Sequence, residues 1–180
     1  MTSDEGPLYA ECPTTEVTVD VDAPRDRVWS LVTDLDLPAR FSSEFQGADW
    51  VDPGAGLALG AQFVGRSRHE ALGQWETTST VVELEPPARF AYAVTEVEAP
   101  SATWRYELAD TPTGGTRLTQ WVQMGPGRSG LSLAIDAMPD KERRIVRRRL
   151  RDLQTNMRAT CEGIKALAEG SSVDAQGVPR

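Results

Sequence analysis

Histidine and cysteine are scarce in this sequence, whose 180 residues include one histidine, His69, and two cysteines, Cys12 and Cys161. Metal centres in proteins need several His, Cys, Asp or Glu ligands at characteristic spacings. The single histidine and the two distant cysteines form no such cluster, so the sequence predicts no metal site. Two cysteines are also too few to build a disulfide framework.

Long apolar runs and an excess of positive charge are missing as well. The first 13 residues are acidic and contain no apolar core, which argues against a signal peptide. No segment reaches the length of a membrane span. The formal net charge is -8 at pH 7, whereas the phosphates of nucleic acid require a basic surface. We therefore expect a cytoplasmic protein that neither spans a membrane nor binds nucleic acid.

Two motifs that could indicate a ligand lack their usual context. The segment Gly125–Gly130, GPGRSG, formally matches G-x-G-x-x-G, but no strand follows it as a dinucleotide-binding unit requires. We interpret it as a flexible loop and expect no cofactor. Seven basic residues lie between Lys141 and Arg151 without interleaved aromatic residues, and we interpret them as the solvent-exposed face of a helix. The sequence contains no G-x-S-x-G nucleophile motif.

The hydrophobic residues recur with regular periods between two polar terminal segments. Val17, Val19 and Val21 alternate with polar residues, as in a half-buried strand, and helical spacing begins at Pro24. We predict a strand, two short helices, six strands in an antiparallel meander and a long helix from Pro139 to Ala168. The predicted ranges are 15–23 for the first strand, 22–34 and 37–45 for the short helices, and 48–52, 61–69, 75–85, 89–97, 101–110 and 116–124 for the six strands.

This order of elements predicts an α+β fold in which a strongly curved antiparallel sheet wraps around the long amphipathic helix. Such an arrangement buries the apolar faces of both elements in one core. We expect one domain at residues 14–169, preceded by a mobile segment at residues 1–13 and followed by a disordered tail at residues 170–180.

Two adjacent predicted strands combine large rings with small side chains on one face. The two-residue period of a strand gives inward sets of Phe63, Gly65, Ser67 and His69 on the first and Trp75, Thr77, Ser79 and Val81 on the second. Such rows leave room for a ligand, with a few hydrogen-bonding groups on the wall. Because His69 lies next to the predicted hairpin, it is either a general base at the rim or an exposed residue without a role.

The order of elements, with VDAPRDRVWSLVTDLDLPARF near its start, resembles the START/Bet v allergen (SRPBCC) superfamily, whose members share the helix-grip fold. The segment GGTRLTQWVQM, preceded by ATWRYEL, looks like the polyketide cyclase/dehydrase branch. The resemblance covers about residues 15–169 and implies an internal, mostly apolar cavity between the sheet and the long helix. Some members close and dehydrate polyketide rings, and many have no known reaction.

The resemblance also implies roles for individual residues. Aromatic polyketide cyclases of this branch carry aromatic residues, a serine and an arginine inside the cavity. The matching positions in this sequence are Phe41, Phe45, Trp75 and Trp104 for the aromatic wall and Ser79 for the serine. The position that matches the arginine is Val81, so any acid or base has to come from elsewhere.

Two functions remain open. The first is a cyclase or dehydratase-like lyase, without a cofactor, that acts on a polyketide-type intermediate in secondary metabolite biosynthesis. The second is a non-catalytic protein that binds or transfers a lipid or an aromatic compound. In either case the expected partner is a hydrophobic small molecule, and the protein is a monomer or a homodimer. The candidate catalytic residues are His69, Ser67, Ser79 and Glu44, and the candidate ligand-binding residues are Phe41, Phe45, Phe63, Trp75, Thr77, Val81, Tyr92, Trp104, Tyr106, Gln120 and Met157.

Overall fold

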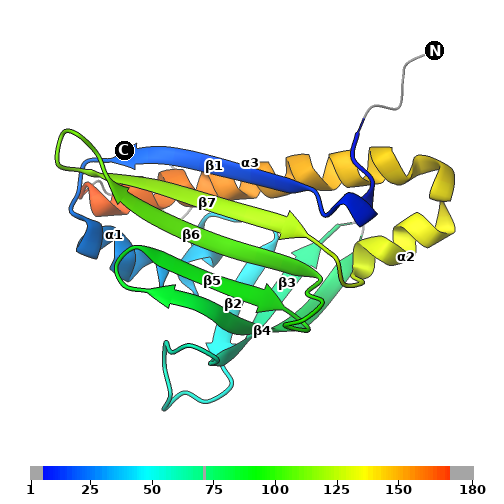
Figure 1. Ribbon diagram of the computed structural model, residues 1–180, viewed down its shortest axis with the longest axis horizontal. Helices are drawn as coiled ribbons and strands as arrows, with labels where there is room; N and C mark the ends of the chain where they lie inside the picture. The colour runs from blue at the N-terminus through cyan, green and yellow to red at the C-terminus, as the bar shows by residue number, and fades with distance from the viewer. Residues whose placement is uncertain (1–5, 71, 171–180) are drawn as a thin grey trace.

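One curved antiparallel sheet organises the chain (Figure 1). The computed structural model describes residues 6–70 and 72–170, and its seven strands lie in the order β1-β7-β6-β5-β4-β3-β2. Strands β2 to β7 therefore form a meander, and β1 pairs with the last of them. The strands are β1 (Thr14–Val21), β2 (Phe45–Trp50), β3 (Gln62–His69), β4 (Gly73–Glu85), β5 (Arg89–Val94), β6 (Ala102–Asp110) and β7 (Thr116–Met124). The predicted fold class and order of strands are confirmed.

The long helix α3 (Glu142–Ala168) runs alongside β1 in Figure 1 and turns an apolar stripe towards the sheet. Residues three, four or seven positions apart lie on one face of a helix, which is why the sequence places this stripe on one side. Its buried members include Val146, Leu153, Met157, Cys161 and Ile164. They form one core with the inward-facing residues of the strands. Within the described residues, no helix is both long and apolar enough to cross a membrane.

Two short helices follow β1, as predicted. Helix α1 (Arg25–Val32) buries Val28 and Val32, and the 3-10 helix η2 spans Leu37–Arg40. The second predicted helix extended to Phe45, but β2 begins at that residue. The strand starts earlier than the sequence predicts because a bulge lets Phe45 and Gly47 pair with consecutive residues of β3, and Gly47 has the φ of 130° that favours glycine.

A further helix, α2 (Gly130–Ala137), occupies a segment for which the sequence predicted no element. Ser129 begins it, because its hydroxyl accepts a hydrogen bond from Leu131 N at 3.2 Å and its own N–H donates to Ser132 Oγ at 3.0 Å. In the preceding glycine-rich loop, Gly127 packs so closely on the carbonyl group of Ala99 that a Cβ would clash. The close contact with Ala99 explains why a glycine occupies position 127, and no dinucleotide-binding unit surrounds this loop in the part of the chain that the structure describes.

The first residues of the described chain attach to the loop before α2 and to the start of α3. The 3-10 helix η1 (Tyr9–Glu11) places Tyr9 so that its hydroxyl donates to Gly127 O at 2.7 Å and its N–H donates to Glu142 Oε1 at 2.9 Å. These contacts hold part of the segment that we expected to be mobile. Residues 1–5 and 171–180, where the sequence predicts mobile and disordered ends, lie outside the described residues.

The segment between η2 and β2, residues 41–44, lies along α3, and we call it the clasp. Its strongest polar contact joins Glu44 to Arg149, whose guanidinium donates to both carboxylate oxygens at 2.6 Å. Only 11% of the Glu44 side chain and 18% of the Arg149 side chain are exposed. Two parallel charge-assisted hydrogen bonds of this kind fix the orientation of both groups.

Two further contacts continue the clasp along the same face of α3. The N–H and the hydroxyl of Ser43 donate to Asn156 Oδ1 at 2.9 and 3.0 Å. The ring of Phe41 covers Gly163 so closely that a Cβ on that glycine would lie 2.5 Å from three ring carbons. Arg149, Asn156 and Gly163 are spaced by seven residues, which places them in one row on the helix.

We predict that Gly163→Ala destabilises the protein, although replacing a helical glycine by alanine normally stabilises a helix by about 1 kcal/mol. The added methyl group overlaps the Phe41 ring, and such overpacking costs about 1–3 kcal/mol. Urea denaturation of the wild type and the variant measures the difference. The matched control is the same substitution in a Phe41→Ala background, where the alanine should be stabilising. Stabilisation in both backgrounds would show that the ring does not rest on Gly163.

Candidate functional site

The sheet face that turns towards α3 carries most of the predicted ligand-binding side chains. Residues directly opposite one another in neighbouring strands share a face. The register pairs Phe63 with Ser79, Gly65 with Thr77, Ser67 with Trp75, Val81 with Tyr92, Tyr92 with Trp104, and Tyr106 with Gln120. Met157 of α3 belongs to the same buried cluster as Val81 and Tyr106. These candidates therefore line one surface, as the two-residue period predicts.

Aromatic side chains of β2, β3, β5 and β6 contact one another in a row on this face. Phe63 makes edge-to-face contacts with Trp50, at 5.7 Å between ring centroids, and with Tyr92, at 5.0 Å. Tyr92 continues to Phe90 at 5.7 Å, and Phe90 lies parallel to Tyr106 at 6.5 Å. Rings in such arrangements attract one another beyond the effect of burial alone. The wall is thus a connected aromatic chain.

The small inward residue Gly65 does not leave open space, because the ring of Phe45 covers it. A Cβ on Gly65 would lie 3.3 Å from Phe45 Cε2. The small residues Gly65 and Ser67 predict a gap in the wall, but the neighbouring strand β2 supplies a ring that covers Gly65. Phe41 covers Gly163 in the same way, so the two phenylalanines predicted to line a cavity each rest on a glycine.

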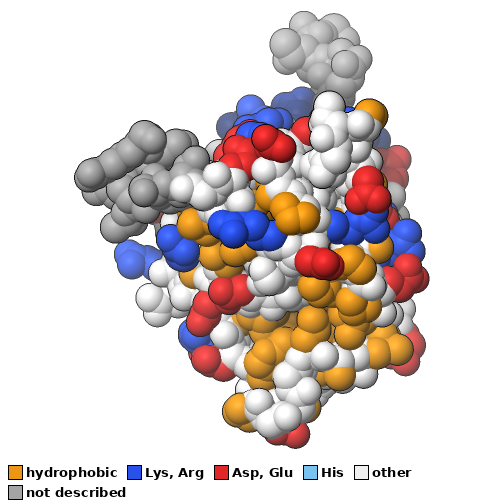
Figure 2. Space-filling view, turned by 90° about the vertical axis from the view of Figure 1, so that its left-hand side faces the viewer, with side chains coloured by type: hydrophobic (Ala, Val, Ile, Leu, Met, Phe, Trp, Pro, Cys, Tyr) orange, Lys and Arg blue, Asp and Glu red, His pale blue; other side chains and the backbone are white. Residues whose placement is uncertain are grey.

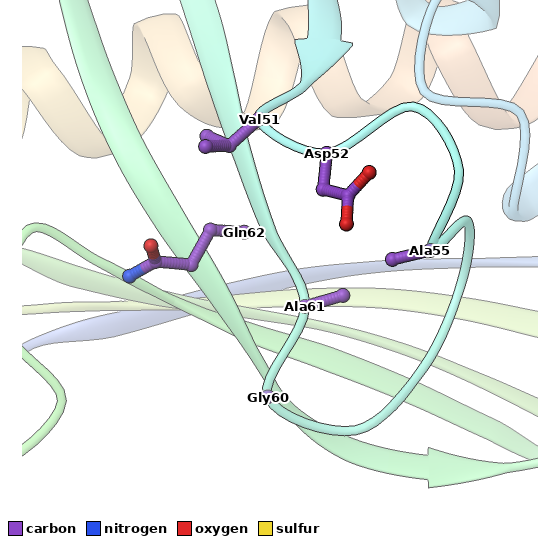
Figure 3. Close-up of a pocket in the computed structure, with 6 residues that line it drawn as sticks. All are labelled: Val51, Asp52, Ala55, Gly60, Ala61 and Gln62. Carbon is purple, nitrogen blue, oxygen red and sulfur yellow. The ribbon is translucent and has the colours of Figure 1, made fainter.

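Two hollows that the structure shows lie at the surface. The first, of about 200 Å³, is formed by the loop between β2 and β3 (Figure 3) and is lined by Val51, Asp52, Ala55, Gly60, Ala61 and Gln62. Its one charged group is Asp52, whose carboxylate accepts a hydrogen bond from Gly54 N at 2.9 Å. The second, of about 210 Å³, lies beside the start of α3. Neither is lined by the predicted ligand-binding residues.

Hydrophobic side chains gather on the end of the molecule that Figure 2 shows, where α1 and the β2–β3 loop lie. The loop exposes Val51 and Leu59, the latter to 68%. Half-buried residues of the same elements, Trp29 and Leu57, pack against the core. At this end of the molecule, exposed apolar side chains and half-buried ones that contact the core therefore belong to the same elements.

The buried polar groups of the inner face form a short hydrogen-bonded chain. Gln120 Nε2 donates to Tyr106 Oη at 3.0 Å, and the Cys161 thiol donates to Gln120 Oε1 at 3.6 Å. Burial raises the pKa of Cys161 to about 12 and raises the pKa values of Tyr106 and Tyr92 well above their usual range. These groups stay protonated at neutral pH, so they can donate hydrogen bonds but are not nucleophiles or bases.

The four candidate catalytic residues do not converge on one point. His69 ends β3 opposite Gly73, and Ser67 lies two residues before it on the same face. Glu44 lies beside this end of β3, because its carbonyl accepts a hydrogen bond from Arg68 N at 2.8 Å, but its carboxylate points to Arg149. Ser79 is 2% exposed and lies deeper, opposite Phe63.

Sequence reasoning missed Arg149, a basic residue of the Lys141–Arg151 run that pairs with the candidate residue Glu44. The available signal was its position on the helix, three residues after Val146 and seven before Asn156, beside the apolar stripe. Val81, the position that the resemblance matches to the arginine of the cyclases, is buried in the core. Among the described residues, no group of three or more His, Cys, Asp or Glu is placed to bind a metal ion.

Comparison with known proteins gives one family and a set of similar structures. The family described as polyketide cyclase/dehydrase and lipid transport matches residues 13–158. A Polyketide_cyc-like protein from Corynebacterium glutamicum is 28% identical with a TM-score of 0.62, and the alignment covers 87% of this chain and 91% of that chain. A search of curated proteins gives no significant match.

Two aromatase/cyclase structures share the fold. The di-domain protein from the BE-7585A biosynthetic pathway is 23% identical with a TM-score of 0.64, and the alignment covers 89% of this chain but 51% of that longer one. The aromatase/cyclase from Streptomyces sp. R1128 is 17% identical with a TM-score of 0.58, over 86% of this chain and 94% of that one. Because the family match extends over most of its length, this chain belongs to the polyketide cyclase/dehydrase and lipid transport family.

Proposed function

We propose that this protein binds a hydrophobic small molecule between the inner face of the sheet and α3, and that the ligand displaces the Phe45 and Phe41 rings. The observation that carries the proposal is the packing of both rings on glycines, Gly65 and Gly163. A ring that rests on a glycine has no side chain interlocked with it at that point. It can therefore leave its place without disrupting the side chains of the opposite wall.

The contacts of the clasp are weaker than those between α3 and the sheet, which supports ligand entry through the clasp. Burying each apolar side chain of the α3 stripe contributes about 1.5–3 kcal/mol. A largely buried ion pair such as Glu44–Arg149, with two charge-assisted hydrogen bonds, contributes about 1–3 kcal/mol in all. Opening the clasp thus costs far less than separating α3 from the sheet, and the core stays folded while the ligand enters.

The chemistry of the wall favours an aromatic ligand with a few oxygen substituents. Phe63, Tyr92 and Trp104 supply ring faces and edges. The protonated hydroxyl of Tyr106 and the amide of Gln120 supply hydrogen bonds at defined places. A flat hydroxylated or keto compound of the polyketide type satisfies both requirements, and a lipid chain satisfies only the first.

Ring closure or dehydration of such a ligand is the second candidate function, as expected for a cyclase of secondary metabolism. The family match and the aromatase/cyclase neighbours favour it. Most of the catalytic effect would then come from holding a flexible chain in a folded form, which brings reacting carbons together. Proton transfer would fall to His69 at the rim, with Ser67 beside it, because the buried thiol and phenols are not bases at neutral pH.

We predict that Phe45→Ala binds emodin, a tricyclic hydroxylated aromatic probe, more tightly than the wild type does. The substitution removes the ring that must otherwise leave Gly65, so less of the binding free energy is used to open the site. Gly65→Ile should weaken binding by at least about tenfold, because its side chain fills the same space permanently. Isothermal titration calorimetry measures both effects.

The matched control for these two variants is Val64→Ala, on the opposite face of β3. It removes apolar atoms from the same strand and should leave the affinity for emodin unchanged. Equal affinities for Phe45→Ala, Gly65→Ile and the wild type would show that the ligand does not bind at this wall.

For His69→Gln we expect unchanged affinity for emodin. If the protein only binds its ligand, neither the wild type nor the variant should turn over a polyketide substrate. General acid–base catalysis contributes about 10²–10⁴-fold, so a catalytic role would be obvious in turnover of a poly-β-ketone thioester followed by chromatography. A loss of that size with unchanged emodin affinity would replace the binding function by the cyclase function. Arg68→Gln, at the neighbouring exposed position on the opposite face of β3, is the control and should change neither the affinity nor the rate.

A further inference from the structure

A line of cations runs along the exposed side of α3. We call four exposed cations the basic stripe: Arg144, Arg148 and Arg151 of α3, and Lys141, which ends the 3-10 helix η3 (Pro139–Lys141) directly before it. Their spacing of three, four and three residues places them on one side of the helix, over a length of about 15 Å. The whole chain carries a formal net charge of -8, so this surface has the opposite sign from most of the molecule.

Within residues 6–70 and 72–170, most of the basic stripe has no carboxylate partner. Arg148 approaches Asp152, at 3.9 Å between Nε and Oδ2, which is a weak contact of exposed groups. Among the described residues, no carboxylate lies within salt-bridge distance of Lys141, Arg144 or Arg151. The stripe is therefore a run of exposed positive charges with one weak ion pair among the described residues.

The start of the basic stripe surrounds an apolar hollow. This is the second of the two surface hollows, of about 210 Å³, and it is lined by Met138, Lys141, Arg144, Ile145 and Arg148. Met138 is 41% exposed, and α2 exposes a further apolar residue, Leu133. Exposed apolar groups with charged groups around them are typical of surfaces that bind a protein or a membrane. No neutral polar side chain lines the hollow.

We propose that this corner of the molecule, formed by the end of α2 and the basic stripe, binds the surface of an anionic lipid bilayer. A bilayer has negatively charged phosphates at its surface and apolar acyl chains directly below them. The phosphates match the cations of the hollow, and the acyl chains match Met138 and Ile145. The lining offers no hydrogen-bonding pattern that would select a particular peptide, and a bilayer requires none. The acidic remainder of the chain is repelled by the same surface, so the protein docks in one orientation.

The binding is weak and reversible. Each Lys or Arg near an anionic membrane contributes about 1 kcal/mol, and the apolar contribution comes from one or two side chains. Because the cations are exposed, salt screens them over a Debye length of about 3 Å at 1 M. Membrane association and ligand binding use different faces of α3, so either can fail without the other.

The test is co-sedimentation of the full chain with unilamellar vesicles. We expect binding to vesicles of phosphatidylcholine and phosphatidylglycerol in equal parts, little binding to phosphatidylcholine alone, and release by about 1 M salt. Arg144→Glu should weaken binding by at least about tenfold, because an attractive charge becomes a repulsive one. Met138→Asp should also weaken it.

Each variant has a matched control elsewhere on the molecule. Arg117→Glu makes the same change in net charge at an exposed site on β7, and Leu59→Asp makes the same change of an exposed apolar residue in the β2–β3 loop. Neither should affect sedimentation by more than the scatter of the assay. Circular dichroism verifies that all four variants fold.

Three results would overturn the proposal. One is the absence of binding to the anionic vesicles. Another is an equal loss of binding in Arg117→Glu and Arg144→Glu, which would show that vesicle binding depends only on the net charge of the protein. The third is binding of poly-L-glutamate without binding of vesicles, which would assign the basic stripe to an acidic protein partner.

Discussion

Burial of the apolar stripe on α3 is the interaction on which the rest of this structure depends. The stripe recurs with helical period over most of a 27-residue helix, and one face of one sheet covers it. That requirement directs the alternating side chains of all the strands, from Val17 to Met124, inwards. It also leaves one row of α3, at Arg149, Asn156 and Gly163, free for the segment that connects η2 to β2.

The interior differs from a uniformly interlocked core because two phenylalanine rings at its boundary rest on glycines. Phe41 covers Gly163 and Phe45 covers Gly65, and the largely buried Glu44–Arg149 ion pair holds the clasp, which includes Phe41, against α3. Close packing normally makes a core resistant to change. Here one of the two rings lies against the helix and the other against β3, on either side of the space in which we propose that a ligand binds.

The periodic parts of the fold could be predicted from the sequence, because apolar spacing reports directly which face of a strand or helix is buried. The contacts of single residues could not. The bulge at Phe45, the helix capped by Ser129 and the pairing of Glu44 with Arg149 depend on residues distant in sequence or on one local hydrogen bond. Small inward residues such as Gly65 predicted a gap, because a sequence does not show which neighbouring ring will fill it.

The most direct test of ligand entry between the sheet and α3 is NMR of the protein with ¹³C-labelled methionine methyl groups, titrated with emodin. Met157 is buried on α3 behind the aromatic wall, whereas Met138 is exposed at the far corner. Ring currents act over short distances, so the account predicts a large, saturable shift of the Met157 signal and an unchanged Met138 signal. A shift of Met138 with an unchanged Met157 would contradict it, because the aromatic compound would then bind at the surface.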